Sequence, residues 1–113
     1  TDTDNLNVVA FEKETMDKLG LIPEIASRYR ATYFSHIIGG YAAGYYSYLW
    51  AEVLDTDAFE AFKEHGVFDK NTADSFRKNI LEKGGTEDPM TLYRGFRGAD
   101  PSLEPLLKNR GLK

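Results

Sequence analysis

The chain has 113 residues, of which 42% are hydrophobic, so it has enough apolar material for a folded domain and is not composed like a disordered tail. Its 18 acidic residues outnumber its 14 basic ones and give a formal net charge of -4, which argues against a nucleic-acid partner because a negative surface repels a phosphate backbone. With no cysteine and only two histidines, the chain lacks disulfides, thiolate metal sites and the imidazoles that most zinc sites need, so we expect it to bind no metal alone.

The N-terminal part predicts one helix followed by mostly irregular chain. Apolar residues recur at helical spacing between residues 5 and 19, and Gly20 follows at the position of a left-handed cap. Pro23 predicts the start of a short second helix that continues to about Arg28. Residues 29–40 are rich in β-branched and aromatic side chains and end in two glycines, which favours an irregular passage into a loop.

Residues 41–62 predict the longest element, a central helix that contains Gly44 but no proline. At about 1.5 Å per residue, such a helix is roughly 33 Å long. Its first half is apolar almost all round, so we expect it to be buried on several sides. A small domain cannot easily provide that cover, and we expect the isolated chain to expose hydrophobic surface and to self-associate. The alternative is that the shorter capped helices pack on the long one into a small core, so that the chain folds autonomously.

Three shorter helices with capping signals are predicted after the central helix. Asp69 precedes a helix to about Lys83, Asp88-Pro89 precedes a helix through Phe96, and Asp100-Pro101 or Ser102 precedes a third that Gly111 ends. The expected fold is therefore all-α, a bundle-like single segment over residues 1–113 with short capped helices around one long helix. His65 is interpreted as a structural side chain at the end of the long helix, where a cation meets the helix dipole favourably.

Neither a targeting signal nor a membrane segment is indicated. The N-terminus is acidic and polar, unlike a signal peptide, and the apolar stretch 34–54 is interrupted by Glu52 and by glycines. We therefore expect a cytoplasmic location and no membrane contact.

The segment from His36 to Tyr48 is dense in side chains that can bind a peptide. On a continuous helix, Tyr41, Tyr45 and Tyr48 fall at i, i+4 and i+7, so their three phenols project from one face. Phenol donors suit a peptide carbonyl or a developing oxyanion, because each hydrogen bond strengthens as negative charge appears. The alternative is that the tyrosines are core residues whose hydroxyls reach backbone carbonyls, and that His36 is a structural histidine.

Long and specific runs surround these tyrosines. They are Tyr29–His36, Gly39–Leu54, Gly84–Met90 and the ending from Phe96 to Leu112. Together they resemble the thimet oligopeptidase family of zinc metallopeptidases, and most closely its bacterial peptidyl-dipeptidase members. The likeness covers essentially the whole chain, and the tyrosine segment is its most specific part.

The family's metal site lies outside the region of resemblance. Its members hold zinc with the two histidines of a His-Glu-x-x-His helix and a glutamate on a following helix. This chain contains no His-Glu-x-x-His, so the resemblance implies the C-terminal part of a catalytic domain. Zinc is then a cofactor of the full-length enzyme and is not bound by this chain, which is inactive alone. Its implied partners are short peptide substrates and the remainder of the catalytic domain.

The resemblance also implies roles for individual residues. Tyr48 matches the tyrosine that donates a hydrogen bond to the tetrahedral oxyanion. His36, Tyr41 and Tyr45 match residues that contact the substrate backbone. Gly39-Gly40 match a glycine-rich loop that adapts to different peptides and moves on closure.

These implications predict part of a zinc peptidyl-dipeptidase that releases C-terminal dipeptides from short peptides. An endo-acting oligopeptidase of the oligopeptidase A kind is the alternative within the family. A non-catalytic helical interaction module is the alternative outside it.

Overall fold

The computed structural model describes residues 3–113, in which the regular elements are helices and no strand occurs, so the all-α class is confirmed. The chain divides between Tyr45 and Tyr46 into two compact units. The N-terminal unit extends up to Tyr45, and the C-terminal unit is Tyr46–Lys113. No helix among the described residues is long and apolar enough to cross a bilayer.

The first helix of the N-terminal unit is α1, Val8–Lys18, and it confirms the helix predicted there. It begins after Asn7, whose side chain accepts a hydrogen bond at 3.1 Å from the main-chain N–H three residues on. On its surface, Glu12 pairs with Arg30 and accepts the Ala31 N–H at 3.3 Å. The bond from Arg30 holds the pKa of Glu12 below its usual value. This contact ties α1 to the chain that leads into the tyrosine segment.

Two predictions for the N-terminal unit are wrong. No helix forms after Pro23, where the chain makes only a turn in which the Ile25 N–H donates to the Ile22 carbonyl at 3.0 Å. The stretch 29–40, predicted to be irregular, contains the one-turn helix α2, Ser35–Ile38.

The long helix of the C-terminal unit is α3, Ser47–His65, and both its ends differ from the predicted 41–62. Residues Ala42–Tyr46 form the 3₁₀ helix η1 instead. Ala42 has a φ of +46°, which a right-handed α-helix excludes, and Gly44 lowers the helical propensity of the stretch. The α-helix therefore begins later than the spacing suggests, and it continues to Gly66, whose φ of +113° ends it.

All three of the capped helices that the sequence predicts are present. They are α4, Lys70–Phe76; α5, Pro89–Arg97; and α6, Glu104–Asn109. Asp69 caps α4 and Asp88 caps α5, each by accepting the main-chain N–H three residues on, at 2.7 and 2.9 Å. Before α6, the Ser102 hydroxyl accepts a main-chain N–H at 3.1 Å. Asp69 and Asp88 thus locate α4 and α5 correctly from sequence, whereas the N-cap of α6 is Leu103, which makes no side-chain capping bond.

Beyond α4 the predicted helix continues with a different hydrogen-bond pattern. The segment η2, Arg77–Leu81, is π-helical, and the Glu82 N–H donates to the Arg77 carbonyl five residues earlier at 2.9 Å. The Asn79 side-chain amide donates to the Ser75 carbonyl at 2.9 Å, so this acceptor is shared with a side chain. Helical propensity alone does not distinguish the two patterns.

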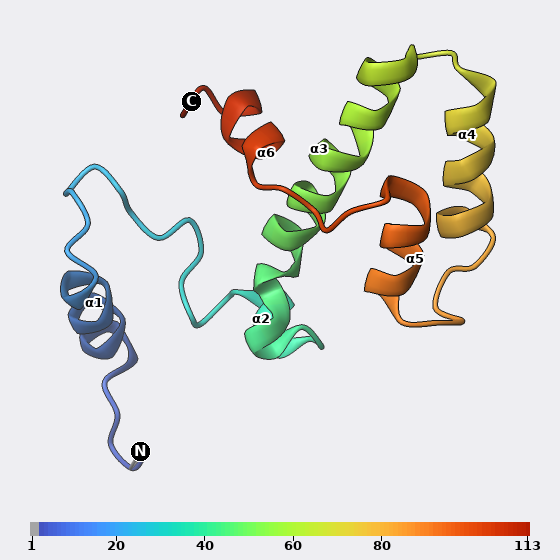
Figure 1. Ribbon diagram of the computed structural model, residues 1–113. Helices are drawn as coiled ribbons and strands as arrows, with labels where there is room; N and C mark the ends of the chain where they lie inside the picture. Colours follow the sequence, from blue (N-terminus) through green and yellow to red (C-terminus); the bar gives the residue numbers. More distant parts are fainter. Residues whose placement is uncertain (1–2) are drawn as a thin grey trace. The chain divides into compact units, whose positions relative to one another are not determined.

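In the C-terminal unit, α6 lies on one side of α3, and α4 and α5 lie on the other (Figure 1). Aromatic rings from three helices meet on the second side, where the Phe62 ring lies 6.0 Å from Phe76 and 6.4 Å from Phe96, measured between centroids. The apolar side chains buried in the described residues are Val53, Ala61, Leu92, Tyr93 and Leu106. The core of this unit therefore forms along α3, as the length of that helix predicts.

A buried polar network joins α5 to α3. Asp57 is 4% exposed, and its Oδ2 accepts the Tyr93 hydroxyl at 2.6 Å and lies 3.5 Å from Arg97 Nε. The Arg97 guanidinium also makes two hydrogen bonds to Glu64, at 2.9 and 2.8 Å. Burial, and then the bond to Asp57, raises the pKa of Tyr93, so this phenol stays a hydrogen-bond donor at neutral pH.

Two large apolar side chains at the start of α3 are about half-exposed. Leu49 is 50% exposed and Trp50 is 45% exposed, although the sequence predicts burial on several sides for this half of the helix. Self-association of the isolated chain stays a prediction.

Candidate functional site

Two of the tyrosines singled out in the sequence, Tyr41 and Tyr45, lie against one histidine, His36, in the N-terminal unit. The His36 ring stacks on Tyr41 at 5.4 Å between centroids with an interplanar angle of 26°. The same ring meets Tyr45 edge-on at 5.6 Å and 76°. The chain thus places one imidazole and two phenols in a single aromatic cluster, made of side chains that can both donate and accept hydrogen bonds.

The turn at Gly39 and Gly40 produces this cluster. It reverses the chain after α2, and the Tyr41 N–H donates to the His36 carbonyl at 3.1 Å. Gly40 has a φ of +138°, which side chains other than glycine rarely adopt, and a Cβ at position 39 would lie 2.9 Å from the Ser35 carbonyl oxygen. Glycine at position 39 thus lets the main chain approach itself closely, and the movement of this loop on closure stays a prediction.

Two further aromatic residues, Phe34 and Tyr29, extend the cluster beyond Tyr45. Phe34 meets Tyr45 edge-on at 4.7 Å, and Tyr29 stacks on Phe34 at 5.1 Å. Tyr45 is half-buried, whereas Tyr41 is 46% exposed. No pattern in the sequence assigns a role to Tyr29 or Phe34, although both lie in the same aromatic run as His36. Their packing against Tyr45 helps to fix the orientation of that ring.

Tyr48 lies in the first turn of α3, in the C-terminal unit, and is 52% exposed. The helical spacing that puts it on one face with Tyr41 and Tyr45 does not apply, because α3 begins at Ser47 and Tyr45 belongs to η1. Tyr41 and Tyr45 instead meet through His36. The physical reason is the backbone at Ala42, whose φ of +46° interrupts the helix that the spacing assumes.

No metal centre is assembled in the part of the chain that the structure describes. Within residues 3–113, no three side chains of histidine, cysteine, aspartate or glutamate gather in a way that could hold a metal ion. These residues therefore do not fit a zinc site, and zinc binding by the full-length protein stays a prediction.

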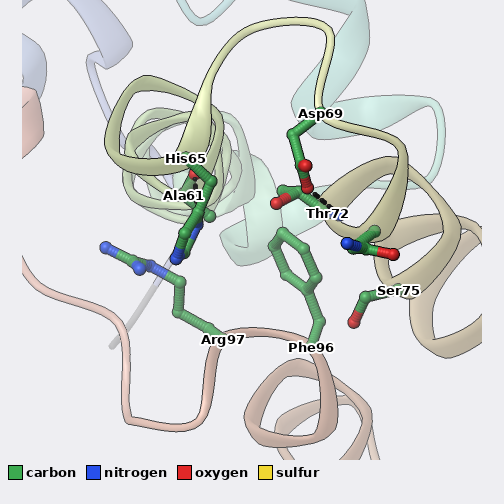
Figure 2. Close-up of a pocket in the computed structure, with 8 residues that line it drawn as sticks. Ala61, His65, Asp69, Thr72, Ser75, Phe96 and Arg97 are labelled. Atoms are coloured by element: carbon green, nitrogen blue, oxygen red, sulfur yellow. Dashed lines mark hydrogen bonds between the residues drawn. The ribbon is translucent and has the colours of Figure 1, made fainter.

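A concavity of about 420 Å³ lies in the C-terminal unit between α3, α4 and α5. Figure 2 shows His65 and Arg97 on one side of it and Asp69 and Thr72 on the other. His65 Nδ1 lies 2.9 Å from the Ala61 carbonyl oxygen, which requires a hydrogen on that nitrogen.

The polar groups around this concavity already have structural partners. The main-chain N–H of Thr72 bonds to Asp69 and lowers the pKa of its carboxyl, as expected for a helix cap. Arg97 is paired with Glu64, and this pairing lowers the pKa of Glu64. The concavity is therefore a weaker candidate than the aromatic cluster, and the structural interpretation of His65 agrees with its bond to Ala61.

Comparison with known proteins identifies close relatives. The sequence matches Peptidase family M3 over residues 1–112. It is 57% identical over 81 residues to oligopeptidase A of Escherichia coli (strain K12), which covers 71% of this chain and 12% of the relative. It is 44% identical over 112 residues to dipeptidyl carboxypeptidase of the same organism, covering 98% of this chain and 16% of the relative.

A plant relative extends the comparison. The chain is 49% identical over 100 residues to the probable cytosolic oligopeptidase A of Arabidopsis thaliana, covering 84% of this chain and 14% of that protein. The chain thus spans 12–16% of the length of these relatives.

Proposed function

Since the chain belongs to peptidase family M3, we propose that it is the C-terminal substrate-binding part of a zinc-dependent peptidyl-dipeptidase that hydrolyses short peptides. In this proposal the chain supplies contacts to the peptide and to the oxyanion, and the rest of the protein supplies the zinc ligands and the general base. In this proposal the chain alone is inactive, because the zinc ligands and the general base belong to the rest of the protein.

The observation that carries the proposal is the cluster of His36, Tyr41 and Tyr45 around the Gly39-Gly40 turn. Imidazole and phenol groups can pair with both the N–H and the C=O groups of an extended peptide. Stacked rings lose little conformational freedom when a ligand binds, since each is already held by its neighbours. We therefore assign these residues to the substrate backbone on either side of the bond that is cleaved.

Tyr48 has the proposed catalytic role, donation of a hydrogen bond to the oxyanion of the tetrahedral intermediate. Its position supports this role, since it is half-exposed on the first turn of a long helix. A donor aimed at charge that develops only in the transition state lowers the barrier without tightening substrate binding.

The proposed specificity is the release of C-terminal dipeptides. The match to dipeptidyl carboxypeptidase of Escherichia coli extends over 98% of this chain, which supports that specificity. Internal cleavage is the competing outcome, and oligopeptidase A relatives match a shorter stretch at higher identity. The cytoplasmic location also stays a prediction.

A pair of peptides distinguishes the two specificities in the full-length peptidase. One carries a free C-terminal carboxylate, and the other has the same sequence with a C-terminal amide. A dipeptidase that requires the carboxylate releases C-terminal dipeptides from the first and stalls on the second, because burying an unpaired binding group is costly. Mass spectrometry of the products reads this directly, and equal internal cleavage of both peptides would overturn the dipeptidase assignment.

A further inference from the structure

The face of α3 that carries Tyr48 is also the face covered by α6. Glu52 follows Tyr48 by four residues and therefore lies on the same side of the helix, one turn further along. A groove between the two helices continues along this side, lined by Phe59 and Lys63 of α3 and by Pro105 among other residues of α6. The buried residues of α3, Val53, Asp57 and Ala61, form a separate stripe.

That buried stripe points away from Tyr48. At about 100° per residue, Asp57 lies on the opposite side of α3 from Tyr48. The packing of α4 and α5 on α3 therefore holds the far side of the helix. The position of Tyr48 therefore depends on contacts to the face of α3 that carries it, which we call the near side.

Arg110, near the C-terminus, makes two hydrogen bonds to Glu52 on this near side of α3. Arg110 Nε donates to Glu52 Oε1 at 3.2 Å, and Arg110 Nη2 donates to Glu52 Oε2. The two residues are 58 positions apart. A guanidinium that donates to both oxygens of a carboxylate fixes direction as well as distance.

The backbone of Arg110 is itself held in place. Its N–H donates to the carbonyl of Leu106 at 3.0 Å, and Leu106 is the buried residue of α6. The next residue, Gly111, has a φ of +67°, and the Leu112 N–H turns back to the Leu107 carbonyl at 2.9 Å. The end of α6 is therefore closed by a left-handed cap that presents Arg110 to α3.

The start of α3 has little local support. Tyr46 at its N-cap makes no side-chain hydrogen bond to the helix, and residues 47–51 are exposed. The 3₁₀ helix η1 leads directly into α3, and because 3₁₀ hydrogen bonds have poorer geometry than α-helical ones, this end of the helix tends to fray. A contact to the second turn limits that fraying in the turn that contains Tyr48.

We propose that Arg110 is a positioning residue, which acts through Glu52 to hold the first turn of α3 and thereby aims the Tyr48 phenol. This inference rests on the oxyanion role proposed for Tyr48. Both partners are partly exposed, with 48% of the Arg110 side chain and 35% of the Glu52 side chain accessible. Such pairs contribute little to overall stability, so the effect should appear in turnover rather than in unfolding.

The test uses the full-length peptidase with Arg110→Ala and Arg110→Lys. A small displacement of a catalytic donor can cost up to about 100-fold in rate, and for this one-turn contact we expect Arg110→Ala to lower kcat by roughly tenfold. KM and the urea midpoint should stay close to wild type. The kcat of Arg110→Lys should lie between those of the wild type and of Arg110→Ala, because lysine keeps the positive charge but cannot donate to both carboxylate oxygens in the planar geometry of a guanidinium.

Arg94→Ala is the matched control. Arg94 bonds to Asp100 at 2.7 Å and is also half-exposed, but it lies on α5 and away from α3's first turn. We expect this variant to keep wild-type kcat. An equal loss in both arginine variants would mean a general effect of removing charge and would overturn the inference.

A double variant separates this inference from the proposed function. In a Tyr48→Phe background the phenol is absent, so Arg110→Ala should lower kcat little further. If the two losses multiply instead, or if Arg110→Ala alone leaves kcat unchanged, Arg110 does not act through Tyr48. If Tyr48→Phe alone has wild-type kcat, it is the proposed oxyanion role that fails.

Discussion

Replacing Tyr48 with phenylalanine in the full-length peptidase should lower kcat by about 100- to 1,000-fold, the usual cost of removing one oxyanion donor. The substitution deletes only the hydroxyl, so the ring on the first turn of α3 keeps its shape. KM should change little, because the hydrogen bond forms with charge that is absent from the bound substrate. Steady-state kinetics measure both constants, and circular dichroism and zinc content check that fold and metal are unchanged.

Tyr46→Phe is the appropriate control for this prediction. Tyr46 lies two residues before Tyr48 and is 72% exposed, and it is not among the predicted site residues. The control variant should keep wild-type kcat. Near-normal turnover in Tyr48→Phe, or an equal loss in both variants, would remove the oxyanion role from Tyr48.

The second large effect should follow from replacing the buried Asp57 with alanine. Tyr93 then loses its 2.6 Å acceptor and retains only a 3.4 Å contact to the Leu54 carbonyl. Arg97 Nε, which already lacks a hydrogen bond, loses the carboxylate beside it. Arg97 keeps its two hydrogen bonds to Glu64 but loses the buried carboxylate beside Nε, and the buried Tyr93 hydroxyl loses its acceptor, so we expect a loss of about 3 kcal/mol in the free energy of unfolding.

Urea unfolding of the 113-residue chain, followed by far-ultraviolet circular dichroism, measures this loss. Asp55→Ala is the matched control, because Asp55 is an exposed aspartate on the same helix. Its substitution should change stability by no more than about 0.5 kcal/mol. If the two variants are equally stable, the network of Asp57, Tyr93 and Arg97 does not hold α5 on α3.

Helices that begin at a capping residue could be predicted from sequence because the signal is local. Asp69 and Asp88 each bond to a main-chain N–H three residues on, so their identity and position are enough to place α4 and α5. The start of the long helix could not be predicted in this way. It depends on the backbone of Ala42, which is set by the turn before it and not by the apolar spacing of residues 41–62.

The candidate site shows the same division. The residue types of the tyrosine segment identify it, because a dense group of phenols beside two glycines is unusual whatever its conformation. Their arrangement depends on the turn at Gly39 and Gly40: Tyr41 and Tyr45 meet through the ring of His36, which no helical spacing predicts. The pairing of Glu52 with Arg110 joins residues 58 positions apart and has no local signal at all.

Inhibition by a phosphinic peptide tests the central claim, that Tyr48 recognises the oxyanion, most directly. Such a peptide carries a tetrahedral phosphinate in place of the scissile amide and so resembles the transition state more than the substrate. Its inhibition constant should rise in Tyr48→Phe by about the same factor as kcat falls, on the order of 100-fold. An inhibition constant equal to that of the wild-type enzyme would contradict the role of Tyr48.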